Sequence, residues 1–129
     1  MTAPTARPIR HLPFSAEAAP LQLAASLALL AGVEAGGLPV MRWYGMDPPA
    51  LILGSSQQPE QVDPVARRTL GVHVYRRSSG GGAVLTTEQL GLDIALPAND
   101  PLLPTDITAS YRWLGEVWVA ALAGLGIEG

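Results

Sequence analysis

The chain has 129 residues, of which 48% are apolar and 15% are charged, and its formal net charge is −3. This size and composition fit one domain with a buried core and exclude a highly charged disordered chain. The small net charge gives no reason to expect nucleic acid or an anionic membrane as a partner. Because there is no cysteine, these residues cannot supply a disulfide, a thiolate metal site or a cysteine nucleophile.

No segment of the sequence indicates a signal peptide or a membrane-spanning helix. The start of the chain lacks an apolar run, and the most apolar stretch, Leu21 to Val33, is 13 residues long. Such a stretch is too short to span a bilayer. We therefore expect a soluble, cytoplasmic protein.

The first part of the chain predicts an arm and a helix. Residues 1–14 indicate an irregular arm that leads into a first strand. Pro20 suits the start of a helix and Gly36 follows its end, so we expect a helix from Pro20 to Glu34. Apolar residues wrap nearly all round this helix, which predicts that it is buried between layers.

Short strands and one short helix follow. The segments Val40 to Tyr44 and Ala50 to Leu53 predict two strands, separated by the turn sequence Met-Asp-Pro-Pro. Asp63 and Pro64 predict the cap and the first residue of a short helix. Gly71 is expected to end that helix.

The second half predicts three more strands and a final helix. Val72 to Arg76 alternates between apolar and polar residues, and Ala83 to Thr86 and Leu90 to Leu96 predict a hairpin-like pair. Ile107 to Leu122 predicts a helix with a buried apolar stripe. Strands joined by hairpins, with helices on one face, predict an α+β domain with a mixed or antiparallel sheet. We see no internal repeat and no clear domain boundary.

The sequence Arg-Arg-Ser-Ser-Gly-Gly-Gly at residues 76–82 is the sharpest feature of the chain. Successive glycines allow the backbone to approach a ligand closely and to form an anion-binding nest. Arg76 and Arg77 add positive charge suited to phosphate or carboxylate. A flexible linker has the same composition, but its place between two strands, with paired arginines, favours a binding loop.

Two common nucleotide-binding loops are excluded by the residues that surround the glycines. No lysine follows them, and the next element is predicted to be a strand, so the loop is not a Walker A motif. It is also not the Gly-x-Gly-x-x-Gly turn that precedes a helix in dinucleotide-binding folds.

The loop resembles the glycine loop of the lipoate–protein ligase A family. In that family the pattern is close to Arg-Arg-x-Ser/Thr-Gly-Gly-Gly-Ala-Val, against RRSSGGGAVL here. The upstream segment Leu51 to Pro59 is similar to the family's apolar strand followed by Gly-x-x-Gln-Asn-Pro, and Trp43 lies where the family often has a tryptophan. The resemblance extends from about residue 9 onward, so residues 1–129 look like the N-terminal part of one catalytic domain.

The resemblance implies the fold shared with biotin ligases and class II aminoacyl-tRNA synthetases, here incomplete. It implies that ATP, with Mg²⁺, and lipoate or octanoate react to an acyl-adenylate, and that the acyl group passes to a lysine of a lipoyl carrier domain. The residues implied to bind ATP or the acyl-adenylate are Arg77, Gly82, Ala83, Val84 and Leu85. The residues implied to shape the acyl pocket are Gly54, Gln57, Ser79, Gly80 and Gly81. No metal ligand and no catalytic residue is identified in the chain.

Three features depart from the family pattern. Thr86-Thr87 stands where the family often has His-Asp, and Ala25 and Ser26 stand where the first family helix usually carries acidic residues. The family lysine that grips the acyl carbonyl and phosphate follows the last helix, and this chain contains no lysine. We therefore expect a fragment, a truncated reading frame, or one half of a split enzyme that a second polypeptide completes.

Other functions remain open at this point. An octanoyltransferase of the same fold is one alternative, and a non-catalytic module that holds an acyl-adenylate or a carrier domain is another. Biotin ligase fits less well because its loop mixes arginine and glycine. Asp93 lies in an apolar strand, where it can face the pocket or the solvent.

Overall fold

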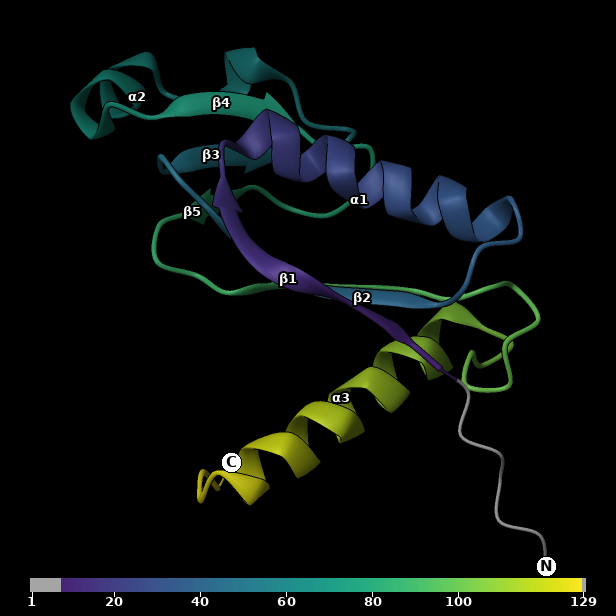
Figure 1. Ribbon diagram of the computed structural model, residues 1–129. Coiled ribbons are helices and arrows are strands. Elements are labelled where there is room, and N and C mark those ends of the chain that lie inside the picture. The colour runs from purple at the N-terminus through teal and green to yellow at the C-terminus, as the bar shows by residue number, and fades with distance from the viewer. Residues whose placement is uncertain (1–7, 129) are drawn as a thin grey trace, which may run out of the picture. The chain divides into compact units, whose positions relative to one another are not determined.

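The computed structural model describes residues 8–128; the first part of the predicted arm lies outside them. The chain divides into two compact units, Met1–Ala95 and Leu96–Gly129 (Figure 1). The strands and helices confirm the predicted α+β class. That all residues belong to one catalytic domain stays a prediction.

The first unit contains two three-stranded sheets, each of mixed direction. In the first sheet, β2 (Val40–Met46) lies between β1 (Arg10–Glu17) and β6 (Gly91–Ala95). β1 runs parallel to β2, and β6 runs antiparallel to it. The prediction of an irregular arm up to residue 14 was wrong for residues 10–14, because β1 begins at Arg10; residues 10–12 pair with β2, and a register shift follows before Ser15.

The second sheet is built around β3 (Ala50–Leu53). β4 (His73–Arg76) runs parallel to it on one side, and β5 (Val84–Thr86) runs antiparallel on the other. The predicted hairpin-like pair was wrong, because β5 pairs with β3 while β6 pairs with β2 in the other sheet. The chain therefore crosses between the sheets after β2 and again after β5.

Helix α1 (Ala19–Glu34) confirms the predicted first helix and packs against β2 and β6. Ala19, Gln22 and Val33 are its buried residues. The prediction that α1 is buried on most sides was wrong, since Leu21 is 57% exposed. The helix is apolar all round, but within this unit only one of its sides meets a sheet.

The predicted short helix is confirmed as α2 (Pro64–Leu70), which follows the single turn η1 (Pro59–Gln61). The Asp63 carboxylate accepts hydrogen bonds from the first-turn amides of α2, and Gly71 ends the helix with φ +64°. Short polar residues are favoured at the position that caps the start of a helix, and glycine is favoured just after its end.

The second unit consists of a loop and α3 (Ile107–Gly124), whose first turn is capped by Asp106. The helix is confirmed, but its predicted buried stripe was wrong. None of its residues is buried; Ile107 is 74% and Tyr111 is 73% exposed. A single helix and a loop provide no second layer within the unit. Between residues 8 and 128, no helix has the length and apolar character needed to cross a membrane.

Candidate functional site

A cavity of about 470 Å³ opens in the first unit beside the glycine loop. Leu23, Ala24 and Leu27 of α1 form an apolar wall, and the rings of Tyr44 and Tyr75 contribute from β2 and β4. Arg76, Arg77, Ser78 and Ser79 line it where β4 enters the glycine loop. The cavity thus combines a hydrocarbon wall with a cationic, hydroxyl-bearing rim.

The glycine loop is held in place by Arg77. Its Nη2 donates to the carbonyl oxygens of Gly80 at 2.8 Å and Gly82 at 2.9 Å. Its backbone amide donates to the Leu53 carbonyl at 2.9 Å, which ties the start of the loop to the end of β3. Gly81, with φ +96°, turns the chain between the two carbonyls that Arg77 holds. Arg77 therefore organises the loop whose ligand it was predicted to contact.

Gly54 lies under the loop where β3 ends. A Cβ built on Gly54 would lie 2.0 Å from the Gly81 carbonyl oxygen, so only glycine allows the two backbones to pass so closely. The Gly54 amide donates to Oε1 of Gln57 at 2.9 Å, and the Ser55 amide donates to the Ser79 carbonyl. These contacts make Gly54 and Gln57 supports of the loop.

The residues predicted to bind the ligand therefore form three groups: those that line the cavity, those that fix the glycine loop, and those that are exposed. Of the predicted acyl-pocket residues, Ser79 lies on the cavity wall, while Gly54, Gln57 and Gly81 fix the loop. Of the predicted nucleotide-binding residues, Arg77 lies on the wall as well. The others are exposed along the loop and β5, and their roles stay predictions: Gly80, Gly82, Ala83, Val84 and Leu85.

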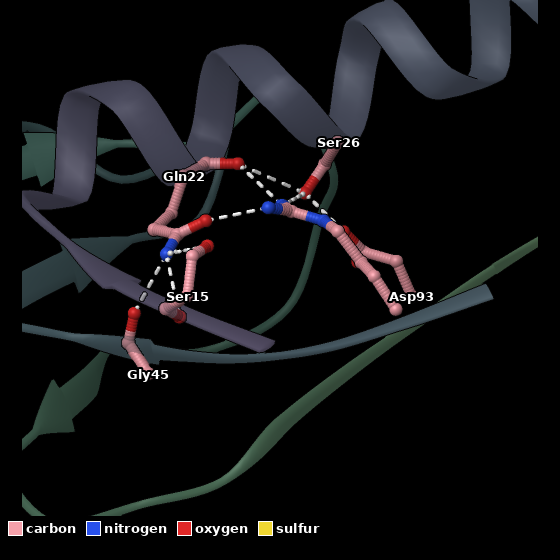
Figure 2. A network of polar contacts seen from close by, with 6 residues as sticks. Ser15, Gln22, Ser26, Gly45 and Asp93 are labelled. Carbon is pink, nitrogen blue, oxygen red and sulfur yellow. Dashed lines mark hydrogen bonds and ion pairs between the residues drawn. The ribbon is translucent and has the colours of Figure 1, made fainter. Parts of the chain in front are cut away.

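The sequence did not predict the buried polar network that Figure 2 shows; two of its members, Ser26 and Asp93, also line the cavity. Arg42 of β2 is 5% exposed and reaches the Asp93 carboxylate of β6 at 2.9 Å. Its guanidinium also donates to the side chain and the backbone carbonyl of Gln22, which is 1% exposed. Ser26 donates to Asp93 at 2.8 Å. Four residues from α1, β2 and β6 are thus joined in one network.

Gln22 extends this network toward β1. Its Nε2 donates to the Gly45 carbonyl at 2.9 Å and to the Ser15 carbonyl at 3.2 Å, as Figure 2 shows. Because all its polar atoms are paired, burial of the amide is compensated. The open question about Asp93 is resolved as well, since its side chain faces Arg42 and borders the cavity.

Tyr44 contacts this network and also lines the cavity. The Arg42 guanidinium carbon is 4.4 Å from the centroid of the ring, within cation–π distance. Burial raises the pKa of the Tyr44 phenol, and the Asp93 carboxylate raises it further; Arg42 and a hydrogen bond with Ser26 act in the opposite direction. The phenol therefore stays neutral over the physiological pH range.

A metal site is not evident in the part of the chain that the structure describes. No group of three or more histidine, cysteine, aspartate or glutamate side chains in residues 8–128 could hold an ion. Asp93, the carboxylate that borders the cavity, is already bound to Arg42. The cavity as described suits an organic anion with a hydrocarbon chain.

The sequence model of the lipoyl protein ligase A/B catalytic domain matches residues 19–129, which include α1, the glycine loop and both sheets apart from β1. The chain belongs to this family. This confirms the resemblance that the glycine loop indicated.

Curated relatives of this family member include octanoyltransferases. "Octanoyltransferase LipM" of Kyrpidia tusciae is 35% identical over 91 residues, which cover 70% of this chain and 33% of that protein. "Octanoyltransferase LipM" of Carboxydothermus hydrogenoformans is 38% identical over 94 residues, which cover 72% and 35%. The chain thus spans about a third of the length of these relatives.

Solved structures with a similar fold include lipoate–protein ligases. A lipoate-protein ligase A bound with ATP matches with a TM-score of 0.80 and 29% identity, over 92% of this chain and 47% of that one. The putative lipoate protein ligase Ta0514 of T. acidophilum with bound lipoic acid matches with a TM-score of 0.78, also at 29% identity, over 92% and 48%. These matches confirm the predicted ligase-like fold, of which the chain spans about half.

Proposed function

We propose that this chain forms the acyl-binding part of an enzyme that attaches an octanoyl or lipoyl group to a lysine of a lipoyl carrier domain. The observation that carries the proposal is the cavity of about 470 Å³ between α1 and the glycine loop. Its size falls within the range of small-molecule sites. Its apolar wall suits a medium-length hydrocarbon chain, and its arginine-bearing rim suits the anionic or electron-rich head of an activated acyl group.

Octanoyl transfer from one carrier to another is the first candidate reaction. It is supported by relatives named octanoyltransferase, two of which are 35% and 38% identical to this chain. In such a reaction the acyl carbon exchanges one bond to a carrier for a bond to the acceptor lysine. The 129 residues contain neither cysteine nor lysine, so in this proposal they bind and orient the acyl group and supply neither a thiol nor an amine to the reaction.

ATP-dependent ligation is the second candidate, and the solved ligase bound with ATP supports it. The glycine loop fits an anion because consecutive glycines expose backbone amides and Gly81 adopts φ +96°. The described residues offer no carboxylate cluster for Mg²⁺. In this proposal Mg²⁺ binds mainly through nucleotide phosphates and water, as it commonly does.

The partners follow from the same reasoning. A lipoyl domain supplies the acceptor lysine. A second polypeptide is a further candidate partner, because one solved relative at 26% identity and a TM-score of 0.69 is described as a bi-partite lipoate protein ligase with its E2 lipoyl domain. We place the reaction in the cytoplasm, where carrier proteins and ATP are available.

Calorimetric binding tests the acyl site directly. The probes are a non-hydrolysable octanoyl-adenylate analogue, an octanoyl-pantetheine thioether and ATP alone. Ala24→Phe places a ring in the cavity and should weaken binding of both octanoyl probes at least about tenfold, or about 1.4 kcal/mol. Ala31→Phe is the matched control, since Ala31 is exposed on the same helix and lies outside the cavity.

The results separate the candidates. Binding of the octanoyl-pantetheine thioether in the absence of nucleotide favours octanoyl transfer. Tight binding of the octanoyl-adenylate analogue, with no binding of the thioether, favours ligation. Equal binding by wild type and Ala24→Phe, with both proteins folded, would contradict the proposed site. Mass spectrometry of a lipoyl domain after incubation with octanoyl donors then distinguishes an enzyme from a non-catalytic binding module.

A further inference from the structure

Gly91 of β6 and Tyr44 of β2 face each other across the first sheet. The Tyr44 ring lies so close over Gly91 that a Cβ at this position would meet its Cζ at 2.5 Å and both Cε atoms at 2.8 Å. Carbon atoms in contact normally lie about 3.5–4.0 Å apart. A side chain at position 91 and the present position of the Tyr44 ring therefore exclude each other.

The backbone itself does not require glycine at position 91. Gly91 is not one of the described glycines that have a positive φ angle, and any residue can adopt its strand conformation. Gly45, which follows Tyr44 on β2, differs from Gly91, because a Cβ there would meet the side chains of Ala16 and Phe14 at an ordinary 3.5 Å. What distinguishes Gly91 is the aromatic ring that covers it.

The surroundings of the ring decide where a displaced Tyr44 would go. The Arg42 guanidinium lies 4.4 Å from the ring centroid and is held by Gln22, Ser26 and Asp93, so it resists movement (Figure 2). Gly91 of β6 lies against the ring as well. Tyr44 borders the cavity, which is the free space beside the ring.

We propose that Gly91 sets the length of acyl chain that the cavity accepts, by letting the Tyr44 ring lie against β6 at the cavity wall instead of further into the cavity. This inference rests on the proposed function. A methyl group at position 91 would displace the ring by about 1 Å, the difference between the 2.5 Å approach and an ordinary contact, and the cavity is the free space beside the ring. Such a shift is large enough to remove room for the end of a long chain and too small to obstruct a short one.

The test compares wild type, Gly91→Ala and Gly45→Ala with a series of non-hydrolysable acyl-adenylate analogues that carry butanoyl, hexanoyl, octanoyl and decanoyl chains. In Gly91→Ala, affinity for the longest chain that wild type binds should fall about tenfold or more, with a change below about threefold for butanoyl. Gly45→Ala should follow wild type along the whole series. Equal weakening of every chain in Gly91→Ala, or no weakening, would overturn the inference.

Unfolding in urea tests the ring contact without any ligand. Gly91→Ala should lower the unfolding midpoint when Tyr44 is present and raise it slightly in a Tyr44→Ala background, where no ring meets the new methyl group and alanine suits the strand better than glycine. Equal effects in both backgrounds would overturn the inference, because the steric contact would then be absent. If wild type bound no analogue, the proposed function would fail and this inference with it. Binding by wild type without a dependence on chain length in Gly91→Ala would overturn the inference alone.

Discussion

Removal of the Asp93 carboxylate is the sharpest test of the buried network. Asp93→Ala leaves the Arg42 guanidinium, which is 5% exposed, without its counter-charge. The carboxylate accepts from Arg42 Nε at 2.9 Å and from Ser26 at 2.8 Å. Hydrogen bonds to charged groups contribute about 1.5–3 kcal/mol each. Because the Asp93 side chain keeps 23% of its exposure, water screens part of the interaction, and we expect a loss of about 3 kcal/mol.

Urea unfolding monitored by tryptophan fluorescence measures this loss as a fall in the midpoint at an unchanged slope. Asp93→Asn should lower the free energy of unfolding by less than Asp93→Ala, because the amide oxygen still accepts a hydrogen bond from Arg42 although the negative charge is gone. Glu17→Ala is the control, since Glu17 is an exposed carboxylate at the end of a strand in the same sheet. A loss in Asp93→Ala as small as that in the control would refute the reasoning, because the network would then contribute no net stability.

Three further predictions concern neighbouring parts of the fold. Thr86→Val should lower the free energy of unfolding by about 2 kcal/mol and Thr86→Ser by much less, because the buried hydroxyl accepts from the Ala50 amide and donates to the Ala50 carbonyl, both at 3.0 Å. Urea unfolding of the two variants measures the difference, and equal losses would contradict the prediction. Gly54→Ala should abolish octanoyl-probe binding in calorimetry, because its Cβ would strike the backbone oxygen of Gly81, and unchanged affinity would show that the loop does not need this approach. Burial raises the pKa of the Tyr44 phenol, so the folded state holds this proton more tightly; the resulting stability is complete below about pH 10 and is lost as pH rises through the folded-state pKa. Tyr44→Phe should flatten that part of a plot of unfolding free energy against pH, and an unchanged slope would count against the shift.

Local structure could be predicted from the sequence because few neighbouring residues determine it. Asp63 caps α2 and Gly71 ends it in the left-handed conformation, as the short polar residue and the glycine indicated. The strand at Ala50–Leu53 was placed to the residue, since turn residues bound it on both sides. Each of these features depends on contacts within a few positions along the chain.

Strand pairing could not be predicted in the same way. β5 and β6 are separated by only four residues, yet they belong to different sheets. Short strands carry little information about their partners, because pairing depends on the side chains that each sheet face buries. The predicted burial of α1 and α3 was too extensive for a related reason. Apolar periodicity identifies a helix face that can be buried, but the neighbouring elements decide whether it is buried.

The glycine loop was found from sequence because its residues are consecutive, whereas the buried polar network was missed because its members come from three separate segments. Arg42 carried a detectable signal: in Val-Met-Arg-Trp-Tyr it shares the strand face of Val40, which is fully buried. A charged residue on such a face requires a partner. Asp93, the polar residue in the apolar sequence Leu-Asp-Ile-Ala, could have been proposed as that partner.

The position of this network explains how a polar cluster can serve an apolar cavity. Arg42 joins α1, through Gln22, to β6, through Asp93, and Gln22 in turn holds β1 and β2 through Ser15 and Gly45. Leu23 and Leu27, the apolar wall of the cavity, lie on the same turns of α1 as the anchored residues. A buried ion pair often adds little net stability compared with apolar residues of the same shape, but its geometry permits few alternatives. An apolar pair in place of Arg42 and Asp93 could therefore leave the sheet stable while allowing α1 to shift, and the cavity would lose its shape before the fold lost its stability.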